Sequence, residues 1–106
     1  MKNEKKLKMV ITIVTTEKTE EVIQALRREG VDGWSITRGR GTSLQSYKEL
    51  WGMRIEPEKE LILTLVPEEM AQKVMNAAVA AGELEKPGNG LSLIIDVENA
   101  TGKIFG

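Results

Sequence analysis

The stretch "LKMVITIVTTEKTEEVIQALRREG", residues 7–30, decides the fold, because it joins two patterns with different periods. Its first ten residues are rich in β-branched side chains that alternate between two largely apolar faces, which predicts a strand inside a sheet. Apolar side chains then recur at helical spacing, which predicts a helix that Gly30 ends in a left-handed turn. Thr16 or Thr19 is expected to cap its start.

The remaining patterned segments repeat this strand and helix alternation. They are a short strand at 34–38, a strand at 60–66, a helix that begins with Pro67 in its first turn and stops at Gly82, and a strand at 91–97. The expected buried stripe of this second helix is Met70, Val74, Ala77, Ala78 and Ala81. The order β-α-β-β-α-β predicts an α+β, ferredoxin-like fold, with two helices on one face of a four-stranded antiparallel sheet.

Two helices cover only one face of such a sheet, so the other face needs a partner. The residues expected on the uncovered face are Val10, Thr12, Ile62, Thr64 and Ile94. Several of them are apolar, and a bare apolar sheet face usually marks association. The sequence therefore predicts an oligomer.

Composition limits the possible chemistry. The 106 residues fit one domain, 1–106, with a net charge of -1 that gives no general attraction to nucleic acid or anionic lipid. Cysteine and histidine are both absent, which removes Ser-His and Cys-His catalysis and thiolate metal sites, so we expect no enzyme and no metal site. The strands carry almost none of the aromatic residues that stack RNA bases. The apolar run behind the charged start is too short for a membrane span, and no signal peptide is recognisable, so we expect a cytoplasmic protein.

The connection between the second and third strands, about 39–58, is far longer than the two to five residues of an ordinary hairpin. It begins "RGRGTS", where two glycines and two arginines supply flexible backbone and positive charge. That chemistry suits an anion pocket, although a glycine-rich turn that leaves a strand is more often only a turn. The segment "ELEKPGNGLS", 83–92, has a similar character, with Lys86 and two glycines, and its alternative is a plain helix-to-strand loop. Neither segment matches a Walker or dinucleotide motif.

The middle of the long connection is too apolar for a passive linker. Its candidate partner-binding residues are Leu44, Tyr47, Leu50, Trp51 and Met53. Tyrosine and tryptophan commonly anchor protein interfaces, and the alternative is that Trp51 folds back on its own domain. Trp34, at a strand start beside a glycine, is expected to be structural.

The chain resembles the P-II signalling proteins, and particularly their shorter P-II-like relatives, over nearly its whole length. The resemblance rests on the β-α-β-β-α-β order, the long loop, "GRG" at 39–41, and "GNG" at 88–90 leading into "LSLIIDVE". It implies a compact homotrimer whose clefts between subunits bind adenine nucleotides. It also implies that the long connection is the T-loop, which docks on a membrane transporter or an enzyme without membrane insertion.

The resemblance also assigns roles to residues at matched positions. The residues implied near the nucleotide are Ser35, Gly39, Arg40, Gly41, Thr42, Thr64, Leu65, Gly88, Asn89 and Gly90. The chain departs from the family pattern at Thr42, Ser43 and Leu91, where an arginine, a glutamine and a lysine are usual, and near Gly102 and Ile104, where arginines grip phosphate. Lys86 and Lys103 are expected to compensate in part. Fewer charges favour ADP or AMP over ATP and weaken the case for magnesium and 2-oxoglutarate.

Two alternatives remain open. One is a sensor of the same fold that binds a small molecule or anion and no nucleotide. The other is a trimeric interaction scaffold, for which Trp51 is a fixed anchor.

Overall fold

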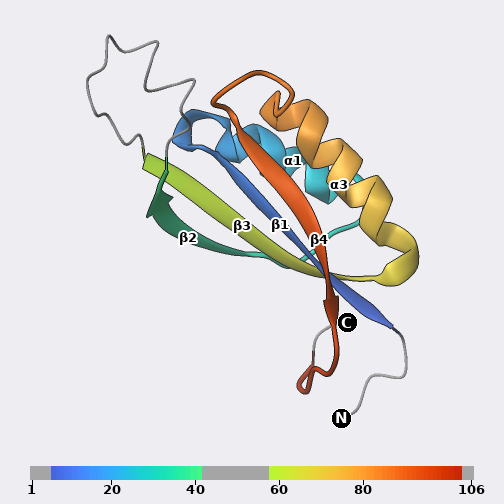
Figure 1. Ribbon diagram of the computed structural model, residues 1–106. Helices are drawn as coiled ribbons and strands as arrows, with labels where there is room; N and C mark the ends of the chain where they lie inside the picture. Colours follow the sequence, from blue (N-terminus) through green and yellow to red (C-terminus); the bar gives the residue numbers. More distant parts are fainter. Residues whose placement is uncertain (1–5, 42–57, 104–106) are drawn as a thin grey trace, which may run out of the picture.

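The computed structural model describes residues 6–41 and 58–103. Its elements are β1 (Leu7–Thr15), the 3-10 turn η1 (Thr16–Lys18), α1 (Thr19–Arg28), β2 (Ser35–Arg40), β3 (Glu58–Pro67), α3 (Glu68–Gly82) and β4 (Gly90–Val97). They form one four-stranded antiparallel sheet in the order β2-β3-β1-β4, with both helices on one face (Figure 1). The expected ferredoxin-like order is confirmed, and β2 lies one to two residues later than the sequence predicts.

β1 occupies the middle of the sheet. It pairs with β3 along one edge and with β4 along the other, so Val10 lies opposite Thr64 on one side and Ile94 on the other. β2 pairs only with β3 and forms an edge. The two apolar faces of β1 match this central position, because a central strand of a covered sheet meets side chains on both sides.

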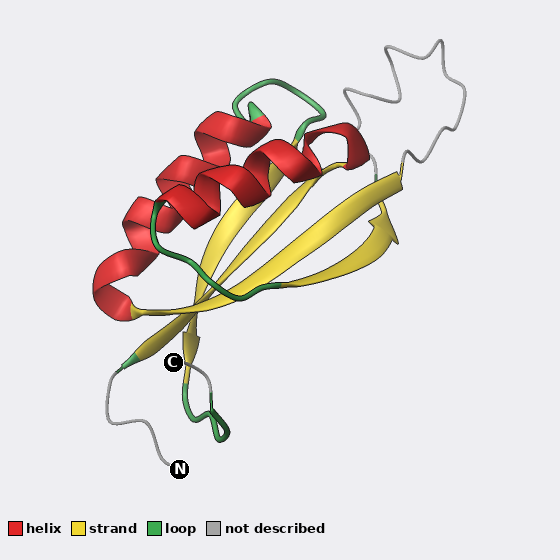
Figure 2. Ribbon diagram, turned by 180° about the vertical axis from the view of Figure 1, so that it is seen from behind, coloured by secondary structure: helices red, strands yellow, loops and turns green. Residues whose placement is uncertain are grey.

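The core lies between the sheet and the two helices, which cross the same face side by side (Figure 2). Val10 and Val14 of β1 pack with Val22 and Leu26 of α1, and each is at most 1% exposed. From α3 the core takes Ala71, Val74 and Ala78. Small alanines let α3 lie close to the sheet. In the expected stripe of α3, Val74 and Ala78 are fully buried, whereas Met70, Ala77 and Ala81 are half-buried.

The sequence-based assignment of the two sheet faces is wrong. The residues expected on the uncovered face, Val10, Thr12, Ile62, Thr64 and Ile94, lie on the face under the helices. The two threonines are tolerated there because their hydroxyls are hydrogen-bonded. Thr12 Oγ1 lies 3.0 Å from Ser92 Oγ, and Thr64 Oγ1 donates to the Gly33 carbonyl at 2.7 Å. Alternation fixes which residues share a face but not which face the helices cover.

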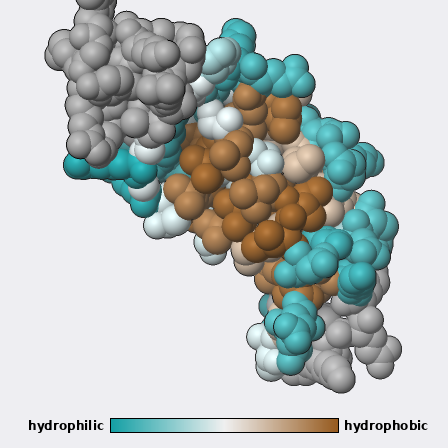
Figure 3. Space-filling model, in the orientation of Figure 1, coloured by the Kyte–Doolittle hydropathy of each residue, from teal (hydrophilic) through white to brown (hydrophobic). Residues whose placement is uncertain are grey.

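The opposite face carries a block of apolar side chains that the helices leave uncovered. We call it the apolar sheet face, and it comprises Met9, Ile11, Ile13, Leu61, Leu63, Leu65, Leu91, Leu93 and Ile95. These side chains lie in register across β3, β1 and β4, and Ile95 and Leu91 are 44% and 49% exposed. Figure 3 shows a continuous hydrophobic area over these strands. The expectation of a bare apolar face is therefore confirmed, with different residues.

The ends of α1 match the predictions only at the C-terminus. Gly30 has φ 93°, Val31 N donates to Leu26 O at 3.1 Å and Gly30 N donates to Arg27 O at 3.0 Å. This is the Schellman arrangement that a glycine stop predicts. The expected threonine cap is absent at the other end, because no side chain caps η1 or α1 and Thr19 Oγ1 donates instead to Glu60 Oε1 at 2.6 Å.

Gly90 starts β4 where no larger residue fits. Its φ is 127°, and a Cβ built on it would lie 1.8 Å from the Ile13 carbonyl oxygen. We expect Gly90→Ala to lower the free energy of unfolding by about 2 kcal/mol or more, since backbone must move. Urea unfolding at fixed protein concentration measures this loss.

Gly33→Ala is the matched control, because nothing lies within 4 Å of a Cβ at that position. Equal stability losses for the two variants would contradict the close contact at Gly90.

Candidate functional site

The two glycine-containing segments meet through a lysine that the sequence analysis missed. Gly39, near the end of β2, pairs with Lys59 of β3, and Lys59 Nζ donates a hydrogen bond to the Gly88 carbonyl at 2.6 Å. The end of β2 and the loop before β4 are therefore linked by one side chain. The sequence signal for Lys59 is faint, since it is only a lysine at the start of an apolar strand.

Lys59 is unusually buried for a lysine, with 7% of the residue exposed. Burial lowers its pKa, because removing water disfavours the charged ammonium. Its hydrogen bond to a main-chain carbonyl satisfies one of three donors. The site thus contains a desolvated amine close to both glycine segments.

Glu83 organises the loop that follows α3. It has φ 52° and ψ 45°, in the left-handed region, directly after the helix ends at Gly82. Leu84 N donates to Val79 O at 3.0 Å and Glu83 N donates to Ala80 O at 3.3 Å, so Glu83 holds the Schellman position where glycine is usual. The left-handed residue at this helix end is therefore a glutamate, although Gly82 was the expected stop.

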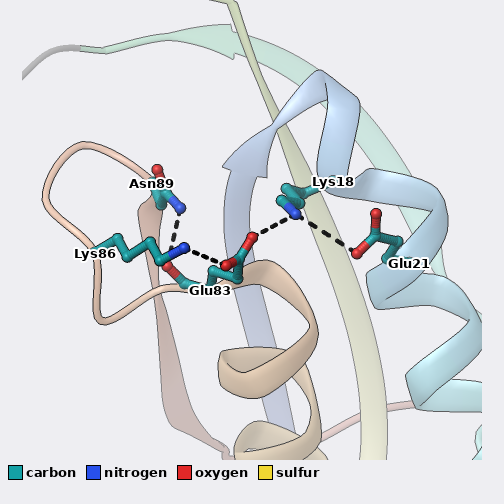
Figure 4. Close-up of polar contacts among 5 residues, drawn as sticks. All are labelled: Lys18, Glu21, Glu83, Lys86 and Asn89. Carbon is teal, nitrogen blue, oxygen red and sulfur yellow. Dashed lines mark hydrogen bonds and ion pairs between the residues drawn. The ribbon is translucent and has the colours of Figure 1, made fainter.

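The Glu83 side chain joins two cations from different parts of the chain (Figure 4). Lys18 Nζ of η1 lies 2.5 Å from its Oε2, and Lys86 Nζ lies 2.5 Å from its Oε1. Asn89 Nδ2 also donates to the Glu83 carbonyl at 3.0 Å. Two of the predicted site residues, Lys86 and Asn89, are thus held by Glu83.

These contacts keep the Glu83 carboxylate ionised. The hydrogen bonds from Lys18 and then Lys86 lower the pKa of Glu83 to about 2. The hydrogen bond that Lys18 donates to Glu83 raises the pKa of Lys18 in return, and the charge of Glu21 at 3.6 Å adds to this rise. Because the pKa of Glu83 is depressed, its ion pairs are intact above pH 4.5 and are lost as pH falls toward about 2.

The backbone of the loop turns repeatedly before β4. Lys86 N donates to Glu83 O at 3.1 Å, and Asn89 N donates to Lys86 O at 3.2 Å. Gly88 and Gly90 both have positive φ, 82° and 127°, which explains glycine at each. An open pocket of about 550 Å³ lies beside this loop, lined by Asn76, Val79, Ala80, Glu83, Glu85 and Lys86.

The structure brings together only some of the predicted nucleotide-binding residues within one chain. Thr64 and Leu65 point to opposite faces of β3, and the Thr64 residue is 3% exposed with its hydroxyl bonded to Gly33. Ser35 lies exposed at the start of β2, five residues from Arg40. Lys103 is exposed after β4.

The other predicted site residues divide into two sets. Arg40 is exposed and Gly41 half-buried where the described part of β2 ends. Thr42 and the predicted partner-binding residues Leu44, Tyr47, Leu50, Trp51 and Met53 lie outside the described residues. Trp34 packs against the core, as expected of a structural residue.

Within residues 6–41 and 58–103, acidic side chains do not gather in groups of three or more that could hold a metal ion. The helices of that same portion are too short or too polar to cross a membrane.

Fold and loop arrangement together define a small ferredoxin-like protein with two glycine-containing segments linked by Lys59 at one end of its sheet. The family model for "Nitrogen regulatory protein P-II" matches residues 7–105, and the chain belongs to the P-II family. A similar solved structure is Arabidopsis thaliana PII bound to citrate. It superposes with a TM-score of 0.70 at 19% identity, over 88% of this chain and 78% of that chain, which shows the shared fold. The resemblance inferred from the sequence is confirmed at the level of family.

Lys59 gives a pH dependence of stability with a definite sign. Its pKa is lowered on folding, so the unfolded chain binds more protons, and stability rises as pH increases from the folded pKa toward 10.5. We expect Lys59→Met to remove this alkaline gain. Urea unfolding of parent and variant between about pH 8 and 10.5 measures the difference.

Lys73→Met serves as the control, because Lys73 is 73% exposed on α3. If the stability difference between the parent and Lys59→Met stays constant over this pH range, Lys59 is not desolvated as described.

Proposed function

We propose that this protein is a cytoplasmic P-II-like regulatory protein. In this proposal it binds an adenine nucleotide in clefts between the subunits of a homotrimer and controls a transporter or metabolic enzyme through its T-loop. The observation that carries the proposal is the family match over residues 7–105, together with the Lys59 link between the end of β2 and the Gly88 loop. P-II proteins are in general regulators that bind adenine nucleotides and protein targets.

The apolar sheet face supports the trimer. P-II proteins are generally homotrimers, and three copies of this face, with nine apolar side chains each, can bury one another around a common axis. Each buried side chain stabilises such an interface in proportion to the apolar area removed from water. Large contiguous exposed apolar patches are uncommon on monomeric soluble proteins.

Charge and backbone geometry support an anionic ligand between Arg40 and the Gly88 loop. Arg40 is exposed near the end of β2, and the Lys86 side chain is 68% exposed. The left-handed Gly88 and Gly90 allow the main chain of this loop to approach a ligand closely. With Lys103, these residues would hold the phosphates, and the small number of cations favours ADP or AMP over ATP.

The proposal that the long connection contacts and controls a partner protein rests on membership of the P-II family alone. Leu44, Tyr47, Leu50, Trp51 and Met53 are the residues proposed to contact the target. Tyrosine and tryptophan are enriched among the few residues that contribute most of the binding energy at protein interfaces, which favours Tyr47 and Trp51 as anchors.

Isothermal titration with ATP, ADP, AMP and cyclic AMP, with and without magnesium, tests the nucleotide site. We expect one nucleotide per subunit, and we expect Arg40→Ala with Lys86→Ala to weaken binding by about tenfold or more through two lost charged contacts. Arg28→Ala with Lys73→Ala removes the same charge from exposed helical positions and is the control. Parent-like affinity of the Arg40 and Lys86 double variant for every nucleotide contradicts the site assignment.

A small-carboxylate sensor is the second candidate. The Arabidopsis thaliana PII structure contains citrate, and Lys59 offers a buried amine beside the two glycine segments. Citrate and 2-oxoglutarate are therefore added to the same titrations. Saturable binding of a carboxylate, with no heat from any nucleotide, favours this candidate. A scaffold without any ligand predicts equal cleavage of the long connection by protease in the presence and absence of every compound.

A charge within the apolar sheet face tests the trimer. Ile11 lies at its centre, opposite Leu63 and Leu93. We expect the parent to sediment as a trimer and Ile11→Asp to yield monomers, because three buried carboxylates are unfavourable in such an interface. Gln72→Asp, on the exposed side of α3, introduces the same charge and is expected to leave the trimer intact. A monomeric parent overturns the assignment of this face.

A further inference from the structure

We propose that Glu83 is a built-in competitor for the phosphate-binding lysine Lys86, and that it sets the ligand preference toward nucleotides with fewer phosphates. The inference rests on the proposed nucleotide site and adds to it a residue that determines specificity. It predicts that the penalty imposed by Glu83 grows with each negative charge on the ligand.

The backbone at Glu83 shows that its side chain is not needed to end the helix. The Schellman hydrogen bonds of α3 are made by main-chain groups, and glycine would satisfy them with less strain at φ 52°. A glutamate here accepts an unfavourable conformation and places its carboxylate between Lys18 and Lys86. The contacts of that carboxylate, rather than the turn, therefore account for the residue.

Lys18 and Lys86 differ in the partners that remain when a ligand displaces the Glu83 carboxylate. Lys18 has a second carboxylate partner in Glu21, at 3.6 Å, and its side chain is 24% exposed. Lys86 is 68% exposed, and its ion pair in this cluster is with Glu83. A phosphate therefore competes for Lys86 with Glu83, while Lys18 keeps a partner throughout.

The competition is electrostatic as well as direct. A phosphate that reaches Lys86 must displace the Glu83 carboxylate or lie beside it, and a pKa of about 2 keeps that carboxylate charged at neutral pH. Repulsion between the carboxylate and the ligand increases with ligand charge, from adenosine through AMP and ADP to ATP. The residue thus disfavours ATP most strongly.

Titration of the full-length Glu83→Gln variant with adenosine, AMP, ADP and ATP tests the proposal. Relative to the parent, we expect unchanged binding of adenosine and gains of about threefold for AMP, fivefold for ADP and tenfold for ATP, because the variant removes a repulsion that grows with the charge of the ligand. Adding Lys86→Met to Glu83→Gln is expected to remove most of the gain. Glu85→Gln, an exposed residue two positions further along the loop, makes the same change in net charge and is expected to give a smaller gain.

Glu83→Asn is the second variant, because asparagine tolerates the left-handed conformation and also removes the charge. The same graded gain is expected from it, with circular dichroism confirming the fold of both variants. A gain that is equal for all four ligands, or no gain in either folded variant, overturns the proposal while the nucleotide site stands.

A parent that binds no adenine nucleotide defeats the proposed function, and inorganic phosphate and pyrophosphate then replace the nucleotides as probes. A larger gain for pyrophosphate than for phosphate in Glu83→Gln supports the competitor role independently. No binding of pyrophosphate by the parent or either variant overturns it.

Discussion

The pairing of β1 with β3 on one edge and β4 on the other is the constraint on which the rest of the structure depends. In-register pairing carries the alternation of β1 across both neighbours, so three strands present one continuous face to the helices and another away from them. The first face closes over the core with Val14, Val22 and Leu26 essentially inaccessible. The second face is largely apolar, and the two helices of the described residues leave it uncovered. A single strand pattern thus specifies both the core of the chain and the apolar face on which the proposed trimer rests.

That pairing also determines where the loops meet. β3 and β4 lie on opposite sides of β1. The start of β3 and the start of β4 therefore both lie near the end of β1. The Lys59 side chain reaches the Gly88 carbonyl, and the Glu83 carboxylate pairs with Lys18 of η1. The loop before β4 is therefore held to the sheet and to η1 by two side chains of opposite charge. A ligand bound by this loop, as proposed, would have to exchange such contacts.

The sequence determined the element order, the Gly30 stop and the site of the long connection, because these depend on local periodicity and backbone freedom. It did not reveal which face of the sheet the helices cover, since both faces of β1 are apolar and threonines can be buried once Gly33 or Ser92 satisfies them. The prediction that Thr16 or Thr19 caps the helix was wrong, because the hydroxyl of Thr19 donates to Glu60 of β3. Lys59 was missed for a related reason, as its partner lies 29 positions away. Glu83 was missed because its left-handed backbone and its pair with Lys18, 65 positions away, are set by the fold, although Lys86 lies only three positions along.

In the role proposed for it, the cluster around Glu83 would tune a ligand site without new binding groups. A cation that already has a carboxylate partner binds a phosphate more weakly than a solvated cation does, because the ligand must first replace an existing ion pair. Exposed ion pairs are individually weak, so the resulting penalty remains within reach of a nucleotide's binding energy. The penalty also depends on the charge of the ligand, which differs between the states of an adenine nucleotide pool. In the role proposed for it, a fixed carboxylate beside Lys86 would convert a difference in phosphate number into a difference in occupancy.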